Sequence, residues 1–508
     1  MKNTRILFIW PILLHCIYAE AITISQEDAV QKALTFFQCS DKHVSIDLFT
    51  VLGGAEMYKV ITEKGWALLS TEKSITPILA YSTIDPFPEI ENMPDGMKWL
   101  FSYYEDAIAY AKQYPQEYGS TNAWEIYCNE SFNTRDSVCL TSLGEVKWGQ
   151  CVNNSSSCIK SYNKFCPTFH NVCCDKTYVG CGAVAIGQVL WYYQWPHTSF
   201  IPDQMLNDNG QISGASSYKF YDWSLMPAAI YANTPIYQAD EVAALLRDCG
   251  YAAHMKYGEN ESISYIDTIG IALTNNFGYA TVTTLRRSDY PGPAWVNLMK
   301  SEISNGRPVI YRGEHPRGRN VGKGHFFILY GFKDDYFRIN WGKNGNWNST
   351  YFRLDSLYVN GIHYNDGQYA LINIQPSYPL CTPITIRPYS NAWNTHFLVQ
   401  RGGGITVGNR KVFGNMQGGI LSGDYVRLTT GFRIYQGASV IIGIRNMHCD
   451  DREELLEQTV HQTPGGTIMF SKDNNSNDTT QVTKMILDGQ FIIRRGDELF
   501  NAQGARVR

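Results

Sequence analysis

The stretch YVGCGAVAIGQVLWYYQWP, from Tyr178 to Pro196, constrains the fold most, because it combines a buried helix with a reactive side chain at the helix start. Apolar residues recur at helical spacing between Ile186 and Tyr193, and the glycines on both sides of Cys181 permit a sharp turn into the helix. The positive end of a helix dipole favours a thiolate at such a position. Buried structural cysteines are also common, so Cys181 alone fits both a nucleophile and a structural residue.

A candidate partner base is His325, in the segment GKGHFFILYG, ahead of an apolar run. A turn-rich FKDD separates this run from a second one, YFRIN, and the pattern predicts a β-hairpin. With a loop over Phe332–Asp335, Gly331 faces Tyr336, and two-residue alternation places His325 and Asn340 on one face of the sheet. An asparagine there can orient the imidazole, so the three side chain types together predict nucleophilic catalysis by a cysteine.

These residues carry a family resemblance. The segments around Cys181 and His325, with RINWGKNGNWNSTYFRLDSL, resemble the streptopain-like secreted cysteine peptidases, a papain-like group. WGQ at Trp148–Gln150 and RPVIY at Arg307–Tyr311 agree with this, and Gly65–Ser82 resembles the inhibitory prodomain of the same family. The resemblance implies an α+β fold, with a papain-like catalytic domain built of a helical part and a twisted antiparallel sheet.

The resemblance also implies a mechanism. The chain is expected to be a cysteine endopeptidase, made as an inactive zymogen, that hydrolyses protein or peptide substrates through a thioester acyl-enzyme. Cys181 is the nucleophile and His325 the general acid and base. Asn340 orients His325, Trp341 covers that contact, and the amide of Gln150 stabilises the oxyanion together with the Cys181 N–H. Neither a cofactor nor a metal is expected.

Two other functions fit the same sequence. One is a secreted binding protein or adhesin with a decayed peptidase domain, favoured by Lys343, which stands where the family usually carries a second tryptophan. The other is a papain-like acyltransferase, which commonly orients its base with aspartate, so Asn340 argues against it.

The N-terminus, MKNTRILFIWPILLHCIYAEA, has basic residues, a short apolar core and small residues near its end, which is typical of a cleaved secretory signal over residues 1–21. We therefore expect a secreted or cell-surface protein without a stable membrane span. The composition, 44% hydrophobic and 18% charged with net charge −4, is that of a globular protein, and its charges form no block that would indicate a nucleic-acid partner.

The remaining chain divides into three predicted regions. Residues 22–135 form an α+β prodomain and activation linker, which by resemblance inhibits the enzyme intramolecularly. Its first helix starts at Ser25 and its second near Pro94. Residues 136–377 form the peptidase domain with a Cys-rich insertion.

From residue 378 to 508, short alternating segments between glycine turns predict a small all-β domain. Its tail resembles the C-terminal sorting domain of proteins exported by the type IX route, which makes secretion machinery a possible partner. Carbohydrate or surface binding stays open.

The chain has 13 cysteines, and many of them crowd the approach to Cys181. In an oxidising compartment we expect these to pair as disulfides, and zinc is the alternative. The odd number left after Cys16 and Cys181 are set aside predicts at least one other thiol. The crowded residues are Cys128, Cys139, Cys151, Cys158, Cys166, Cys173 and Cys174.

Overall fold

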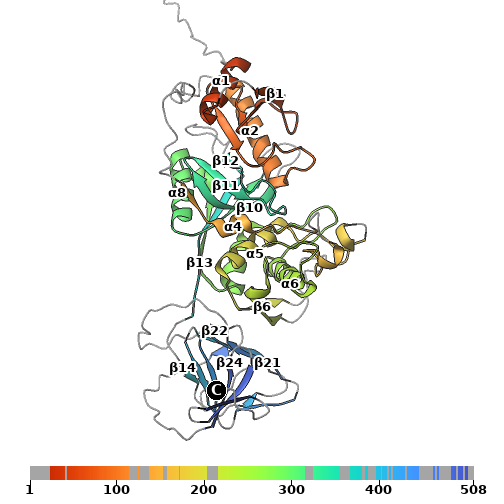
Figure 1. Cartoon of the computed structure of the whole chain (residues 1–508), viewed down its shortest axis with the longest axis vertical. Coiled ribbons are helices and arrows are strands. Elements are labelled where there is room, and N and C mark those ends of the chain that lie inside the picture. The colour runs from red at the N-terminus through yellow and green to blue at the C-terminus, as the bar shows by residue number, and fades with distance from the viewer. Residues whose placement is uncertain are drawn as a thin grey trace, which may run out of the picture. The chain divides into compact units, whose positions relative to one another are not determined.

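The structure is a computed structural model of the whole chain. It describes residues 23–39, 43–113, 124, 137–152, 157–170, 172–202, 216–314, 324–354 and 367–379, and then the strands and short connections between 384 and 501. The expected signal segment, 1–21, and Cys128 lie outside the described residues. The chain divides into two compact units: Met1–Glu145 with Leu285–Ala370, and Val146–Thr284 with Leu371–Arg508. Figure 1 labels their helices and strands.

The first unit begins with the expected prodomain elements. Helix α1 (Gln26–Phe37) starts after Ser25, whose side chain accepts a hydrogen bond from the Asp28 N–H. This confirms the predicted cap. Helix α2 follows Pro94, also as predicted. The remaining elements of this region are β1 (Ser45–Phe49), β2 (Met57–Thr62), β3 (Gly65–Leu69), β4 (Ile78–Ser82) and α2 (Asp95–Gln113).

A single sheet in the first unit contains strands of the prodomain and strands of the peptidase region. Its strand order is β1-β2-β3-β4-β12-β11-β10-β9, and β5 pairs with β10. The prodomain strand β4 pairs with β12, with Tyr81 opposite Tyr351. The prodomain strands and the strands that carry His325 therefore form one continuous hydrogen-bonded sheet. The later elements of this unit are β5 (Ser137–Cys139), α4 (Thr141–Glu145), α8 (Gly292–Ser304), β9 (Val309–Glu314), β10 (Gly324–Lys333), β11 (Tyr336–Asn340) and β12 (Tyr351–Arg353).

The hairpin of β10 and β11 exists, but its predicted register is wrong. Lys333 pairs with Tyr336, so the connection is shorter than expected, and the register shifts between Leu329 and Gly331. Asp334 makes the tight turn possible because it adopts a left-handed φ of 53°. Asn340 consequently lies opposite Ile328. Ile328 is three residues from His325 on a regular strand, so Asn340 and His325 occupy opposite faces of the sheet rather than one face.

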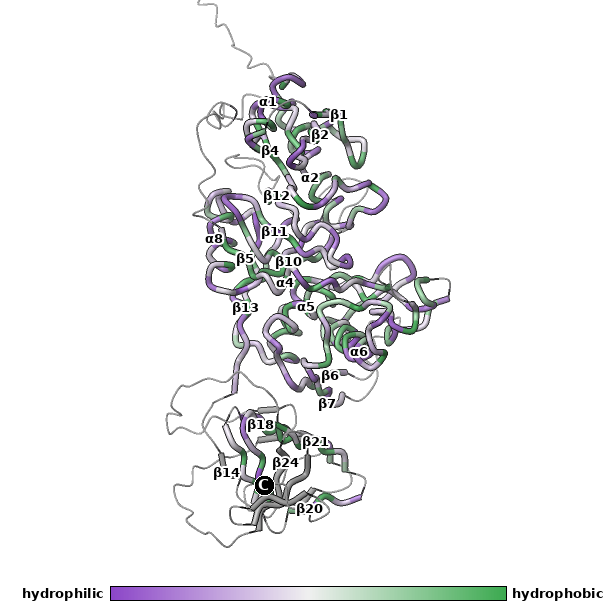
Figure 2. Tube along the Cα trace, in the orientation of Figure 1, coloured by the Kyte–Doolittle hydropathy of each residue, from purple (hydrophilic) through white to green (hydrophobic). Residues whose placement is uncertain are grey.

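The second unit contains the helix predicted from Tyr178 to Pro196, which forms as α5 (Cys181–Tyr193) and packs on α6 (Ile236–Ala252). Gly187 allows close packing, because a β-carbon there would lie 2.7 Å from Leu246. Figure 2 shows both hydrophobic and hydrophilic residues along α6, and its buried residues include Val242, Leu245 and Leu246, as expected for a helix with one buried face. The unit also contains β6 (Thr198–Pro202), β7 (Ser216–Phe220) and α7 (Ile266–Ile271), and the strands β8 (Tyr279–Arg286) and β13 (Gln368–Pro376) cross the unit boundary.

The C-terminal region is a stack of parallel strands, an arrangement not foreseen from the sequence. Ile384 pairs with Ile405, and Ile405 in turn pairs with Val426. A second stack joins His396 to Gln417 and Gln417 to Ser439. Each step advances about 21 residues, the signature of a coiled β-solenoid repeat. The strands of the two stacks are β14 (Ile384–Ile386), β16 (Ile405–Val407), β19 (Val426–Leu428), β15 (His396–Arg401), β18 (Gln417–Ser422) and β21 (Ser439–Ile444).

An antiparallel meander completes the first of these stacks. Strand β24 (Val482–Leu487) pairs with β19, and β25 (Gln490–Arg495) and β26 (Glu498–Asn501) follow. The described C-terminal strands agree with the expected all-β region, and the helices and antiparallel sheet of the remaining chain confirm the α+β class. In the described part of the chain, no helix is long and apolar enough to cross a membrane.

Candidate active site

Cys181 is the first residue of α5 and is half-buried. Gly180 before it has a φ of 88°, and a β-carbon there would lie 2.7 Å from Cε of Met255. The hydroxyl of Ser262 donates to the carbonyl of Tyr178 at 2.7 Å. Met255 and Ser262 thus hold the backbone that leads into α5. The positive end of the helix dipole favours the ionised form of the Cys181 sulfur.

Gln150 lies in a segment that is tied to this helix entry. Trp148 is fully buried, and its indole N–H donates to the carbonyl of Pro227 at 3.0 Å. The carbonyl of Gln150 accepts a hydrogen bond from the Val179 N–H at 3.1 Å. Gln150 is therefore fixed at its backbone to the residue two positions before the candidate nucleophile.

Two disulfides lie in the Cys-rich insertion: Cys151–Cys173 and Cys158–Cys174. The prediction of disulfides here is confirmed for these four residues. It is wrong for Cys139 and Cys166, which are thiols.

The Cys166 thiol is buried, and this burial raises its pKa to about 12, so it is protonated at neutral pH. The thiols outside the disulfides also confirm the expectation of at least one besides Cys181. The sulfur atoms of Cys151, Cys173 and Cys174 lie within 4.8 Å of one another, and all three are used in the disulfides.

His325 is the second residue of β10 and lies opposite Gly313 of β9. It is 7% exposed, and its Nε2 lies 3.3 Å from the carbonyl oxygen of Trp341. A carbonyl only accepts hydrogen bonds, so this contact places the proton of the neutral ring on Nε2. The Trp341 carbonyl is therefore in direct contact with the imidazole, and the predicted role of the Asn340 side chain in orienting His325 stays a prediction.

Asn340 is fully buried and holds the backbone that follows β11. Its Nδ2 donates to the Leu143 carbonyl at 2.8 Å, and its Oδ1 accepts from the Gly342 N–H at 3.1 Å. Asn340 thus braces the turn that carries the Trp341 carbonyl. The Trp341 ring is also fully buried and lies 4.8 Å from that of Phe327.

Helix α2 of the prodomain lies against this side of the sheet. A β-carbon on Gly96 would lie 2.8 Å from Cδ2 of His325 and 2.8 Å from Cε3 of Trp341. One turn later, Trp99 covers Gly313, where a β-carbon would lie 2.3 Å from its ring. Two residues without side chains therefore permit the close approach of α2 to His325. The sequence carried no signal that singled out Gly96.

Further contacts attach the prodomain to the same sheet. The hydroxyl of Tyr104 donates to the Arg353 carbonyl at 2.6 Å, and Thr350 donates to the carboxylate of Asp85 at 2.8 Å. These bonds lie beside the β4–β12 pairing. Together with Gly96 and Trp99, they make the prodomain a closely fitted cover over His325.

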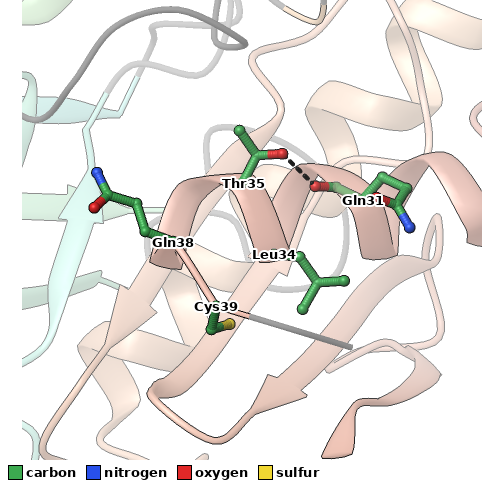
Figure 3. A pocket seen from close by; sticks show the side chains of 5 residues that line it. All are labelled: Gln31, Leu34, Thr35, Gln38 and Cys39. Atoms are coloured by element: carbon green, nitrogen blue, oxygen red, sulfur yellow. Dashed lines mark hydrogen bonds between the residues drawn. The ribbon is translucent and has the colours of Figure 1, made fainter. Parts of the chain in front are cut away.

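Gln150 and Cys181 belong to the second unit, and His325, Asn340 and Trp341 belong to the first. The structure shows contacts that hold together the residues within each group. The ion pair between Cys181 and His325 stays a prediction. Figure 3 shows a surface pocket on α1, whose lining includes no member of either group. It is lined by Gln31, Leu34, Thr35, Gln38 and Cys39.

Two families match parts of this chain. Residues 157–352 match the Peptidase C10 family, and residues 21–108 match the Spi protease inhibitor family. Streptopain of Streptococcus pyogenes is 26% identical over 377 residues, which cover 70% of this chain and 90% of that protein. The thiol protease/hemagglutinin PrtT of Porphyromonas gingivalis is 28% identical over 218 residues, which cover 40% of this chain and only 24% of that larger protein.

Two solved structures are also similar. A fragment of Prevotella intermedia prointerpain A is 23% identical, with a TM-score of 0.49, and the match covers 66% of this chain and 100% of the fragment. Active interpain A from the same organism is 26% identical, with a TM-score of 0.39, and the match covers 47% of this chain and 95% of that chain.

Proposed function

Because residues 157–352 belong to the Peptidase C10 family and residues 21–108 to the Spi protease inhibitor family, we propose that this chain is a secreted cysteine endopeptidase made as a zymogen. The observation that carries the proposal is that the peptidase match spans both Cys181, at a helix start, and His325, with an imidazole oriented by a backbone carbonyl. Its substrates are proteins or peptides.

The chemistry begins with an ion pair. The proton on Nε2 of His325 points at the Trp341 carbonyl, so Nδ1 is the nitrogen that takes the proton of Cys181. The resulting thiolate attacks the scissile carbonyl carbon. Nδ1 of His325 then protonates the leaving amine, and a thioester remains on Cys181. His325 next takes a proton from water, and the hydroxide adds to the thioester carbonyl. The C–S bond then breaks, the carboxylic acid product leaves, and His325 returns its proton to the Cys181 sulfur.

The oxyanion of each tetrahedral intermediate needs donors that are in place before the reaction. The backbone N–H of Cys181 lies at the first position of α5, where an N–H has no acceptor within its own helix. The side chain amide of Gln150 is the second donor. Its support is the hydrogen bond between the Gln150 carbonyl and the Val179 N–H, which ties its backbone to the helix entry. One such donor contributes about 10² to 10³ in rate.

The prodomain inhibits by covering His325. Gly96 brings the first turn of α2 against the imidazole and the Trp341 ring, so a substrate cannot approach that side of His325. Activation requires release of residues 22–135, the expected prodomain and linker. Strand β5 pairs with β10 through Val138 opposite Phe332, which favours retention of β5 in the mature enzyme.

Export to the cell exterior is supported by the signal-like residues 1–21. The C-terminal tail resembles a type IX sorting domain, and we propose that residues 378–508 carry the enzyme to that secretion machinery.

The test is a thiol-directed peptide probe, applied to the activated protein and to the Cys181→Ala variant. Peptidase function predicts stoichiometric labelling at Cys181 and hydrolysis that the variant lacks. Absence of labelling supports the decayed adhesin. Transfer to an added amine in preference to water supports the acyltransferase.

A further inference from the structure

The Cys151–Cys173 disulfide is directly attached to the candidate oxyanion residue. Cys151 follows Gln150 in the chain and is 8% exposed. On the other side of Gln150, the buried Trp148 anchors the segment to the Pro227 carbonyl. The backbone of Gln150 is therefore held at both ends, by an indole before it and by a covalent bond after it.

The other end of this disulfide lies in the segment that leads to the nucleophile. Cys173 begins a single helical turn, Cys173–Asp175, in which Cys174 and Asp175 have left-handed φ values of 60° and 53°. Residues with side chains rarely adopt this conformation, so the turn needs external support. The two disulfides supply it, one at Cys173 and one at Cys174.

A buried amide joins this turn to the helix entry. Asn163 is fully buried, and its Nδ2 donates to the carbonyls of Cys173 and Thr177 at 2.9 and 3.1 Å. Two residues after Thr177, the Val179 N–H donates to Gln150. The Cys151–Cys173 disulfide and the hydrogen bond between Val179 and Gln150 thus close a ring, which contains Gln150 and residues 173–179 and ends next to the start of α5.

We propose that the Cys151–Cys173 disulfide is a positioning element of the oxyanion site, which fixes Gln150 relative to Cys181. This inference rests on the proposed peptidase function. The disulfide does not touch the substrate. It acts by limiting the positions that the Gln150 amide can occupy. Reduction removes the covalent restraint and leaves hydrogen bonds to hold the segment: from the Val179 N–H to the Gln150 carbonyl, from the Tyr162 N–H to the Cys151 carbonyl, and from the Trp148 indole to the Pro227 carbonyl.

The proposal implies that the enzyme is fully active only within a limited range of reductant concentration. The enzyme needs Cys181 as a thiol and Cys151–Cys173 as a disulfide. A dithiol reductant such as dithiothreitol supplies two electrons and two protons to the disulfide, which becomes two thiols while the reductant closes to its cyclic disulfide. Mild reduction activates the enzyme, and stronger reduction lowers its turnover.

The first experiment compares two double variants of the full chain after activation. Cys151→Ser with Cys173→Ser removes the disulfide next to Gln150. Cys158→Ser with Cys174→Ser is the matched control, because it removes a disulfide in the same insertion that is not attached to Gln150. Each is assayed for kcat and KM on a peptide amide, and for the rate at which iodoacetamide alkylates Cys181.

The proposal predicts a tenfold to hundredfold lower kcat for the Cys151/Cys173 variant, a KM within about threefold, and an unchanged alkylation rate. Alkylation by iodoacetamide forms no oxyanion, so it reports the thiolate alone. Adding Gln150→Ala to this variant lowers kcat by less than it does in the wild type. Equal kcat losses in both double variants, or a parallel fall in alkylation, would overturn the assignment.

If the variant does not fold, the wild-type enzyme gives a second test. It is titrated with dithiothreitol while mass spectrometry follows the state of each cysteine. The proposal predicts that kcat falls in step with loss of the Cys151–Cys173 bond, at constant labelling of Cys181. Constant kcat after complete reduction of that bond contradicts it. Failure of the peptidase function itself is distinct, because hydrolysis is then absent at every reductant concentration.

Discussion

Replacement of Gly96 by valine tests the contact between the prodomain and His325. A β-carbon at this position would approach the His325 and Trp341 rings at 2.8 Å, closer than unbonded carbon atoms normally come. Both rings are buried, so they cannot swing away, and the first turn of α2 must move outward. Overpacking of this kind costs about 1 to 3 kcal/mol.

A second effect partly offsets this cost. Valine has a better helix propensity than glycine by about 0.4 kcal/mol, which stabilises α2. The net loss in prodomain docking is then about 0.6 to 2.6 kcal/mol, which raises the undocked population roughly threefold to eightyfold. We therefore expect the uncleaved Gly96→Val chain to hydrolyse a peptide substrate measurably faster than the uncleaved wild type.

The assay measures initial hydrolysis before processing, followed by the time course of activation. Ala109→Val is the matched control, because Ala109 is an exposed residue of the same helix. The mature enzyme provides a further control, since it lacks residue 96 and its kcat must equal that of the wild type. Equal latency of the Gly96→Val and wild-type zymogens would refute the proposed cover over His325.

The remaining predictions concern single side chains. Cys181→Ala abolishes hydrolysis while the thermal midpoint stays within a few degrees, as calorimetry can check. Gln150→Ala lowers kcat by about 10² to 10³ with little change in KM, measured by steady-state kinetics. Asn340→Ala causes a partial loss of kcat and destabilises the fold by about 1 to 3 kcal/mol in denaturant titration, because the Gly342 N–H and the Leu143 carbonyl lose their partner. Burial raises the pKa of Asp85, despite hydrogen bonds from Thr350 and Ser349 and the attraction of Arg338. Ionised Asp85 therefore stabilises the fold less than protonated Asp85, so its contribution to stability is present below its ordinary pKa and is lost as the pH rises. In the Cys181→Ala background, the Asp85→Asn variant should lose less thermal stability between pH 4 and 7 than the protein that keeps Asp85. An identical pH profile for the two proteins would contradict this.

The positions of the secondary structure elements could be predicted because they follow from local chemistry. The Ser25 cap, the glycine before Cys181 and the apolar spacing of α5 act over a few residues, and the structure has all three. The register of the His325 hairpin could not be predicted in this way. It depends on the left-handed Asp334 and on the irregularity near Gly331, and neither has a distinctive sequence pattern.

The contacts around His325 were harder to foresee for a similar reason. The partner of its Nε2 is the Trp341 backbone carbonyl, and every residue has a carbonyl, so no side chain type marks this one. Gly96 likewise matters through the side chain it lacks. The C-terminal repeat, by contrast, left a readable signal. ITI at 384, ITV at 405 and VRL at 426 recur at a constant spacing, and a search for internal repeats would have found them.

The central claim is that Cys181 and His325 act together as a nucleophile and its base. The most direct measurement is the pH profile of Cys181 alkylation in the activated enzyme, compared with that of the His325→Ala variant. We predict that wild-type Cys181 reacts rapidly well below neutral pH, and that the variant reacts only as the pH approaches the range of an ordinary thiol, near 8.5. Coincident profiles for the two proteins would contradict the account.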